Sequence, residues 1–310
     1  MSSSKQEIGF LTMAFGRPKY IKQAEDLARS LRANMPGYRI ALITDQEAYS
    51  NELFDQVIPL KADHGKGVVQ KLFLYDYSPF EETLFFDADS ICLKPFDDEL
   101  DAIRKYGFSP IWSGFRHPGQ KDPYLEDLSF TLSQVGIKRM PKFNGGVYYF
   151  DRGTFAQSVV EKAHQIYQDR AALKIRNFDS AGPNDETIYG LALESTGRQA
   201  YHAWGKFMKT PLSAITRIKV DPKRQICEFS NKYAHQTPAI LHFAGPSVRS
   251  LEYKFCIWYF NKKPGTTVYN TVLGLLTLWQ YLTFYPISKI NSIGFAIYEN
   301  TRGKNQSSQA

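Results

Sequence analysis

Cysteine is scarce in this sequence of 310 residues. The three cysteines, Cys92, Cys227 and Cys256, lie far apart, and no pair has the Cys-x-x-Cys spacing. An odd number of widely separated cysteines argues against a disulfide-stapled scaffold and against a zinc site. This usage is typical of a reducing compartment, so we expect a cytoplasmic location. The first residues, Met1–Lys5, contain no apolar signal core and predict no secretion.

Dense clusters of basic residues are also missing, although the net charge is +7. Lys and Arg that are spread along a chain argue against nucleic acid as the partner. The positive balance still favours anionic partners, such as nucleotide diphosphates or acidic lipid surfaces. Aromatic residues are abundant at 15%, which suits either a well-filled core or a site that stacks on sugars or bases.

Charged residues are absent from residues 264–288. The stretch is rich in Leu, Val, Trp and Tyr, but Asn270, Gln280 and Pro286 interrupt it. A membrane span needs about 20 predominantly apolar residues, and this stretch falls short of that. It is better explained as a segment that is packed on the core or lies at a membrane interface.

The C-terminal part of the chain is therefore expected to divide in two. Residues 261–300 form an apolar extension, packed or interfacial, and the lysines around it, Lys262, Lys263 and Lys289, favour an anionic membrane surface. Residues 301–310 are polar and are expected to be disordered.

Strands and helices alternate over residues 8–87. Apolar runs predict strands at Ile8–Thr12, Arg39–Thr44, Val57–Ile58 and Leu84–Asp87, and helical spacing predicts helices from Tyr20 to Pro36 and over Val68–Tyr75. Such alternation predicts a parallel sheet with right-handed crossovers. Beyond it, the pattern predicts strands at Phe143–Phe150 and Ala239–Phe243, and helices at Thr154–Arg170 and Asp185–Ser195.

Two carboxylates, Asp87 and Asp89, end the apolar run Leu84–Phe86. Residues i and i+2 of an extended backbone point to the same side, so both carboxylates aim at one point at the strand's carboxyl end. Ligands of open α/β sheets bind in that region. Two converging carboxylates repel unless a cation lies between them, and hard oxygen ligands suit Mg²⁺ or Mn²⁺. A solvated acid pair at a loop start is the alternative.

Two further segments combine a small or polar residue with a predicted element. Asn144 precedes Gly145 and Gly146 at a strand entrance, where glycine allows close approach of the backbone to a ligand or forms a bulge. Asn184–Glu186 follows Gly-Pro and starts a helix, so Asn184 or Asp185 is either a ligand contact or the N-cap.

His242 ends another predicted strand, as the aspartate pair does, and Gly245 follows it. An isolated histidine is more often structural than a ligand, but imidazole is an acceptable ligand for Mn²⁺. Arg249 and Lys254 follow and are candidates to hold a diphosphate.

Taken together, these motifs resemble a GT-A fold glycosyltransferase, closest to the retaining glycosyltransferase family 8 that includes glycogenin and galactosyltransferases. The resemblance covers roughly residues 8–255 and rests on segments in the family's order: Leu11-Thr12 with Tyr20–Ala24, Lys71-Leu72, Phe85–Lys94, Phe143–Val147, Asn184–Glu186 and His242–Gly245. It implies an α/β fold with a Rossmann-like mixed central sheet flanked by helices and a C-terminal helical extension. Residues 1–260 are expected to form the transferase domain.

The resemblance also implies the site. Asp87, Asp89 and His242 are the expected ligands of Mn²⁺ or Mg²⁺, and Asn144 and Asp185 are the expected catalytic residues, which position the sugar. Tyr20 is expected against the nucleotide base. The expected donor-binding residues are Leu11, Thr12, Tyr20, Lys71, Asp87, Ala88, Asp89, Asn144, Gly145, Gly146, Asp185, Gly245 and Arg249.

The sequence departs from the family pattern at four places, one of which is Glu186, where the family has Gln after the Asp. The loop Met13–Lys19 is longer and lacks the usual Asn, Gln70 replaces a Ser before Lys71, and Val248 occupies the position of a diphosphate-binding lysine, with Arg249 beside it.

The expected activity is transfer of a sugar from a nucleotide-diphosphate donor to an acceptor hydroxyl. The family resemblance implies a UDP-sugar as the donor and retention of configuration. The acceptor class is open between a glycan, a lipid-linked saccharide, a protein and a small molecule. A sugar nucleotidyltransferase is the second hypothesis, although Met13–Lys19 has only one glycine. A non-catalytic nucleotide-sugar-binding or scaffold protein is the third, and the intact Asp87, Asp89 and His242 argue against it.

Overall fold

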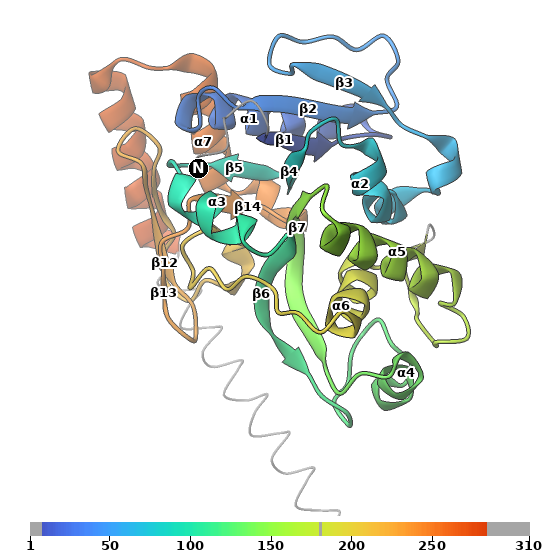
Figure 1. Cartoon of the computed structure of the whole chain (residues 1–310). Coiled ribbons are helices and arrows are strands. Elements are labelled where there is room, and N and C mark those ends of the chain that lie inside the picture. Colours follow the sequence, from blue (N-terminus) through green and yellow to red (C-terminus); the bar gives the residue numbers. More distant parts are fainter. Residues whose placement is uncertain (1–7, 180–181, 284–310) are drawn as a thin grey trace, which may run out of the picture.

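The computed structural model of the chain describes residues 8–179 and 182–283. Its centre is a six-stranded sheet with the order β3-β2-β1-β4-β7-β6 (Figure 1). The strands are β1 (Ile8–Met13), β2 (Arg39–Thr44), β3 (Gln56–Pro59), β4 (Glu82–Asp87), β6 (Phe108–Arg116) and β7 (Met140–Asp151). The first four are parallel, whereas β7 is antiparallel to both β4 and β6. The predicted α/β fold with a mixed central sheet is confirmed.

Helices cover both faces of this sheet, and Figure 1 shows α3 and α5 on opposite sides of β7. In β4, Leu84 and Phe86 pack against the helices of one face while Phe85 packs against those of the other, as the two-residue period of a strand requires. The first face carries α1 (Pro18–Asn34) and α3 (Asp97–Arg104). The second carries α4 (Leu128–Val135), α5 (Thr154–Gln168) and α6 (Asp185–Ser195).

Short strands extend the fold beyond the carboxyl end of β4. One small sheet has the order β10 (Met208–Lys209), β14 (Ile240–His242) and β5 (Ser90–Cys92), and a second joins β11 (Lys219–Asp221), β12 (Ile226–Ser230) and β13 (His235–Gln236). A two-stranded pair consists of β8 (Asn177–Asp179) and β9 (Gly182–Pro183). Because β5 follows β4 after a two-residue turn, its antiparallel pairing with β14 brings the end of β14 to the end of β4.

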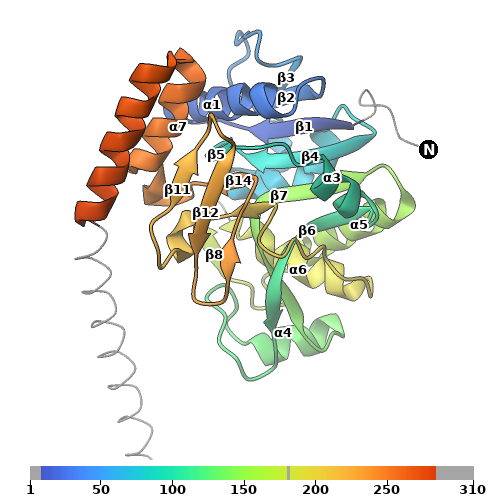
Figure 2. The ribbon, with the colours of Figure 1, turned by 90° about the vertical axis from the view of Figure 1, so that its left-hand side faces the viewer.

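Two helices close the described part of the chain. α7 (Leu251–Lys262) ends at Lys263, which has a left-handed backbone with φ 44°, and a second helix follows over residues 266–283. Figure 2 shows them side by side at the left edge of the molecule. Phe255 and Cys256 of α7 share a third apolar core with Tyr269 and Leu276 of the second helix. No helix within residues 8–179 and 182–283 has the length and hydropathy of a membrane span.

Most predicted elements are present within one to four residues of their expected bounds. The segment predicted as a helix over Val68–Tyr75 is a 3₁₀ helix, Gly67–Phe73, followed by the single turn α2 (Leu74–Tyr77). The other 3₁₀ helices are Ala62–His64, Pro211–Ser213 and Gly245–Arg249. The predicted segments at residues 1–5, 284–300 and 301–310 lie outside the described residues.

Candidate active site

Asp87 and Asp89 lie where the central sheet meets the small β10-β14-β5 sheet. Asp87 is the last residue of β4, and Asp89 lies in the turn that leads into β5. The residue that follows β14 stabilises this turn, because the backbone N–H of Phe243 donates to the carbonyl oxygen of Asp89 at 2.9 Å. Both carboxylates are partly exposed, so they are accessible from solvent.

His242 completes a group of three ligand atoms. In the register of β14 with β5, His242 pairs with Ser90, and its imidazole therefore lies over the turn. Its Nε2 is 3.1 Å from Oδ1 of Asp89 and 3.5 Å from Oδ2 of Asp87. One ligand atom from each of the three residues lies within 4.8 Å of the others, which is the arrangement that a metal ion needs.

Asn144 orients the imidazole. Its Oδ1 lies 2.7 Å from Nδ1 of His242 and also accepts from the backbone N–H of Gly146 at 2.9 Å. With the proton on Nδ1 donated to Asn144, the lone pair of Nε2 points at the carboxylates. A ligating histidine is commonly fixed in this way through its other nitrogen. The predicted residue Asn144 therefore supports a metal ligand from behind.

The two glycines allow this close packing. A Cβ at Gly146 would come 2.5 Å from Nδ1 of His242, and a Cβ at Gly145 would come 2.7 Å from Oδ2 of Asp185. Both distances are too short for any side chain. The glycines are needed because the side chains around β7 approach its backbone closely.

Lys71 lies between the acidic residues of the site. Its Nζ is 2.6 Å from Oδ1 of Asp87 and 3.9 Å from Oδ2 of Asp185, and it donates to the carbonyl of Gly145 at 3.3 Å. Burial alone lowers the pKa of Lys71, but the charges of Asp185 and Asp87 outweigh it and raise the pKa above its ordinary value. Lys71 therefore stays a cation and partly neutralises the carboxylates.

The protonation of the three candidate ligands is mutually dependent. Burial raises the pKa of Asp87 in spite of the nearby Lys71 and His242. Burial also opposes ionisation of Asp89, but the hydrogen bond and charge of His242 outweigh it and lower the pKa. Burial opposes protonation of His242, yet the two aspartates outweigh it and raise the pKa. Without a metal ion, the imidazolium supplies the positive charge that the carboxylates require.

The start of α6 supplies the other acidic side chains. Asn184 is the N-cap, since its Oδ1 accepts from the backbone N–H of Thr187 at 3.2 Å. This leaves Asp185 for another role: its Oδ2 accepts from the hydroxyl of Tyr148 at 2.6 Å. Glu186 accepts from the backbone N–H of Gly145 at 2.8 Å, and burial raises the pKa of its carboxyl. α6 thus links the site to β7.

A pocket of about 310 Å³ opens beside the aspartates. Tyr20 lines it from α1 and is about one-third exposed, with the ammonium of Lys19 4.9 Å from its ring. The remaining lining residues are Met13, Ala14, Phe15, Gln23, Gly67, Val68, Lys71, Asp87, Ala88 and Asp89. An exposed aromatic ring on an apolar wall, opposite charged groups, suits a flat base that carries a charged tail.

Four of the predicted donor-binding residues neither line the pocket nor contact the candidate metal ligands through a side chain. Leu11 and Thr12 are buried within β1 and do not line the pocket. Gly245 and Arg249 are exposed and bound the 3₁₀ helix that follows His242. Donor contacts for these four residues stay predictions.

Sequence reasoning missed the contributions of Phe15 and Tyr148. Phe15 belongs to the loop after β1, where no periodic pattern indicates which side chain points into the pocket. Tyr148 reads as one more apolar residue of a buried strand. A tyrosine at a fully buried position is a usable signal, because its hydroxyl needs a partner.

The donor set fits a divalent cation. Two carboxylates and one imidazole, whose Nε2 would have to give up its proton to bind, are ligands that suit Mn²⁺ or Mg²⁺. The side chains are already converged, and the histidine is already oriented by Asn144. A divalent metal is therefore indicated, while the choice of ion belongs to the proposal below.

Comparisons with known proteins support the predicted fold. No protein-family model matches the chain, and no curated protein sequence matches it. Among solved structures, the chain is similar to the galactosyltransferase LgtC in complex with donor and acceptor sugar analogues, with a TM-score of 0.51 at 13% identity over 87% of this chain and 96% of that one. It is also similar to the glycosyltransferase GlyE of Streptococcus pneumoniae TIGR4, with a TM-score of 0.39 at 15% identity over 63% of this chain and 45% of that one.

The likeness to LgtC spans nearly its whole length and shows that the chain has the GT-A fold of glycosyltransferases. The similarity to GlyE is too low to add to this. At 13% identity the likeness establishes the fold, whereas substrates depend on the site itself.

Proposed function

We propose that the protein is a metal-dependent glycosyltransferase that moves a sugar from a nucleotide-diphosphate donor, a UDP-sugar, to an acceptor hydroxyl. The observation that carries the proposal is the convergence of Asp87, Asp89 and His242 at the edge of a pocket that contains Tyr20. A site for a divalent cation next to a site for a base is what a nucleotide diphosphate requires. The GT-A fold agrees with it.

The difficult step is departure of the diphosphate, on which negative charge accumulates. A divalent cation, Mn²⁺ or Mg²⁺, would be held by Asp87, Asp89 and His242 and would supply charge neutralisation to that leaving group. Lys71 keeps its proton beside Asp87 and adds positive charge to the same region. Arg249, exposed on the segment after His242, is the candidate for a further contact with the phosphates.

Asn144 and Asp185 form the sugar end of the proposed site. Tyr148 and Lys71 hold the carboxylate of Asp185 in place, so it is positioned before the donor arrives. A preset carboxylate can accept hydrogen bonds from sugar hydroxyls at little ordering cost. Asn144 keeps His242 aligned, and the neighbouring Gly145 and Gly146 let Asp185 and His242 approach the backbone of β7.

Retention of configuration is part of the proposal. The acidic side chains nearest the site are already engaged: Asp185 with Tyr148, and Glu186 with the backbone of Gly145. Neither is presented as a covalent nucleophile. This supports a front-face reaction, in which the acceptor hydroxyl attacks on the side of the departing phosphate. The acceptor class stays open between a glycan, a lipid-linked saccharide, a protein and a small molecule.

Calorimetric titration of UDP and GDP into the purified protein, with and without Mn²⁺, tests the proposal. We expect UDP to bind only when Mn²⁺ is present, and a panel of nucleotide sugars to show slow release of one sugar. Failure of both diphosphates to bind would refute a nucleotide-sugar site. Metal-dependent binding of UDP with no release or transfer of any sugar would instead favour a binding or scaffold protein.

A further inference from the structure

The helix over residues 266–283 presents an apolar stripe to solvent. Its positions follow helical spacing along one side, and each side chain is between 43% and 63% exposed: Val268, Leu275, Leu278, Trp279 and Leu282. We call this set the outer face. A contiguous row of large apolar side chains on a surface marks an interaction site more often than scattered single residues do.

The opposite side of the same helix is fixed to the protein. Tyr269 and Leu276 are buried in the third core. The side-chain N–H groups of Gln280 donate to the carbonyl oxygen of Ile218 at 2.8 Å and to Oε1 of Glu252 at 2.7 Å. The helix therefore cannot turn its outer face inward, and nothing within residues 8–179 and 182–283 covers that face.

The charge of the surrounding region identifies the kind of partner. Residues 214–283 contain nine Lys and Arg but only three Asp and Glu, so nearly all of the chain's net charge of +7 comes from this region. The three acids are engaged within the protein: Asp221 with Arg224 and Tyr269, Glu228 with Lys219, and Glu252 with Gln280. The region therefore attracts anionic surfaces.

Basic residues lie at both ends of the outer face. Lys262 and Lys263 are exposed immediately before the helix begins. Near its other end, the guanidinium of Arg217 lies 5.4 Å from the ring of Tyr281, which is itself 64% exposed. Cations and an aromatic ring at the margins of an apolar stripe are the pattern of a helix that lies in a lipid interface.

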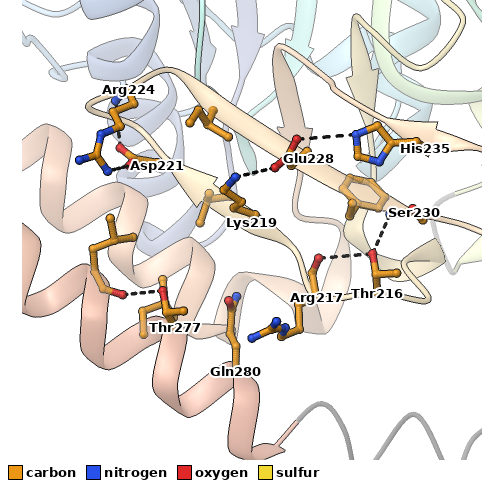
Figure 3. Close-up of a pocket in the computed structure, with 15 residues that line it drawn as sticks. Thr216, Arg217, Lys219, Asp221, Arg224, Glu228, Ser230, His235, Thr277 and Gln280 are labelled. Atoms are coloured by element: carbon orange, nitrogen blue, oxygen red, sulfur yellow. Dashed lines mark hydrogen bonds and ion pairs between the residues drawn. The ribbon is translucent and has the colours of Figure 1, made fainter.

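A groove between β11, β12 and the helix lies on the inward side of the helix, away from the outer face (Figure 3). It measures about 600 Å³ and has Phe229, Leu273 and Leu276 along its apolar wall. Figure 3 shows Arg217 facing Gln280 across it, with Lys219 on the side of the small sheet. Two acids, Asp221 and Glu228, also line the groove and pair with Arg224 and Lys219, so most of its charges are balanced within the protein.

We propose that the outer face of helix 266–283 docks the protein on an anionic membrane surface, with the helix parallel to the bilayer. A second copy of the chain is the competing occupant. The helix has no charged residue between 266 and 283 to flank an apolar seam, whereas paired helices usually carry such charges. The basic surroundings would also repel an identical surface. Both features favour lipid.

Flotation of the full chain with lipid vesicles tests this proposal without reference to sugar transfer. We expect binding to vesicles of phosphatidylcholine mixed with phosphatidylglycerol, little binding to phosphatidylcholine alone, and weakening by salt. Trp279→Glu should abolish binding, because it places a charge in the apolar stripe. Arg217→Glu should weaken it roughly tenfold or more, because a favourable charge is replaced by an unfavourable one.

Trp204→Glu is the matched control. Trp204 is 80% exposed but belongs to the loop before β10, not to the helix, so this variant should bind vesicles like the parent. Unchanged far-ultraviolet circular dichroism and thermal unfolding of Trp279→Glu would show that its fold is intact. Equal binding by Trp279→Glu and the parent, or no vesicle binding at all, would overturn the proposal. So would a dimer in sedimentation velocity that Trp279→Glu dissociates.

Discussion

Asp89 is the residue whose replacement should change the chemistry with least effect on the fold. Asp89→Asn keeps the size of the side chain but removes the charge that faces Nε2 of His242 at 3.1 Å. We expect metal-dependent UDP binding and turnover to fall by about a hundredfold or more, since one preorganised charge partner of a leaving group is lost. Calorimetry and a donor-hydrolysis assay measure this.

Asp98→Asn is the matched control for that substitution. Asp98 is exposed on α3, apart from the pocket, and its variant should behave like the parent. Normal turnover by purified Asp89→Asn would show that the acid pair holds no metal.

The affinity for Mn²⁺ should depend on pH through His242. Its pKa is raised, so the imidazolium competes with the metal ion below that pKa, and neutral imidazole offers Nε2 above it. We therefore expect Mn²⁺ affinity to rise from about pH 6 to about pH 8. His235→Gln, at an exposed histidine on β13, should keep this profile. An affinity that is flat over the range would exclude His242 as a ligand.

Gly146 should tolerate no side chain. In Gly146→Ala the new Cβ would meet the ring of His242 at 2.5 Å, so the imidazole must leave Asn144 and turn away from the aspartates. We expect loss of Mn²⁺ binding with the fold retained. Gly274→Ala is the contrasting variant: its Cβ would meet nothing within 4 Å on a helix, and it should stabilise the protein by roughly 0.5–1 kcal/mol. Undiminished metal binding by Gly146→Ala would contradict the packing described here.

At this scale the sequence indicates the candidate metal ligands and several residues around them, but not the contacts that hold them together. Asp87 and Asp89 are predictable because a two-residue period follows a buried strand, and His242 because it ends another one. The pairing of Lys71 with Asp87 and Asp185, and of Tyr148 with Asp185, joins residues from different elements. No local pattern encodes such a pairing, since it depends on how the elements cross in space.

Among the elements, α6 has the clearest link between local structure and the site. Asn184 caps it and thereby fixes Asp185 and Glu186 at its first turn. Asn184→Ala should cost about 1 kcal/mol of stability, because one backbone N–H loses its acceptor, and should also weaken donor binding. Thermal unfolding and UDP titration measure the two effects.

A substitution at the N-cap of α4 is the control that separates the loss of stability from the loss of donor binding. Asp127 accepts from the backbone N–H of Phe130 at 3.0 Å, so Asp127→Ala should cost a similar amount of stability while UDP binding stays normal. Equal loss of binding in both variants would mean that the cap of α6 acts only through global stability.

The elements also show where prediction from sequence ends. The buried strands β1, β2 and β4 and the amphipathic helices α1 and α5 are predicted because their apolar positions are periodic. β6 is missed: it is an edge strand with register shifts at Pro110/Ile111 and Trp112/Gly114. Such shifts break the alternation on which a strand prediction depends. Of the short strands in the small sheets only β14 is predicted, because the apolar run Ala239–Leu241 marks it, and the others are too brief to show a period.

At the scale of the whole molecule, the site lies between the central sheet and the small β10-β14-β5 sheet. β4 belongs to the central sheet, and β14 belongs to the small sheet that packs on the third core with α7. Asp87 and His242 therefore come from different cores, and their approach requires both to be folded. The three cysteines are free and buried, as a chain without disulfides requires. The cytoplasmic location stays a prediction.

Because the two sheets meet at the metal site, ligands should stabilise the whole chain. On the proposed function Mn²⁺ and UDP would bind only the folded protein, and at about one hundred times the dissociation constant they should add about 2.7 kcal/mol. For a chain of this size we expect the unfolding temperature to rise by about 5 °C. Asp89→Asn should show no rise with the same ligands, whereas Asp98→Asn should match the parent. If the unfolding temperature of Asp89→Asn rises as much as that of the parent, UDP and Mn²⁺ bind at another site. The stabilisation would then not depend on Asp87 and Asp89.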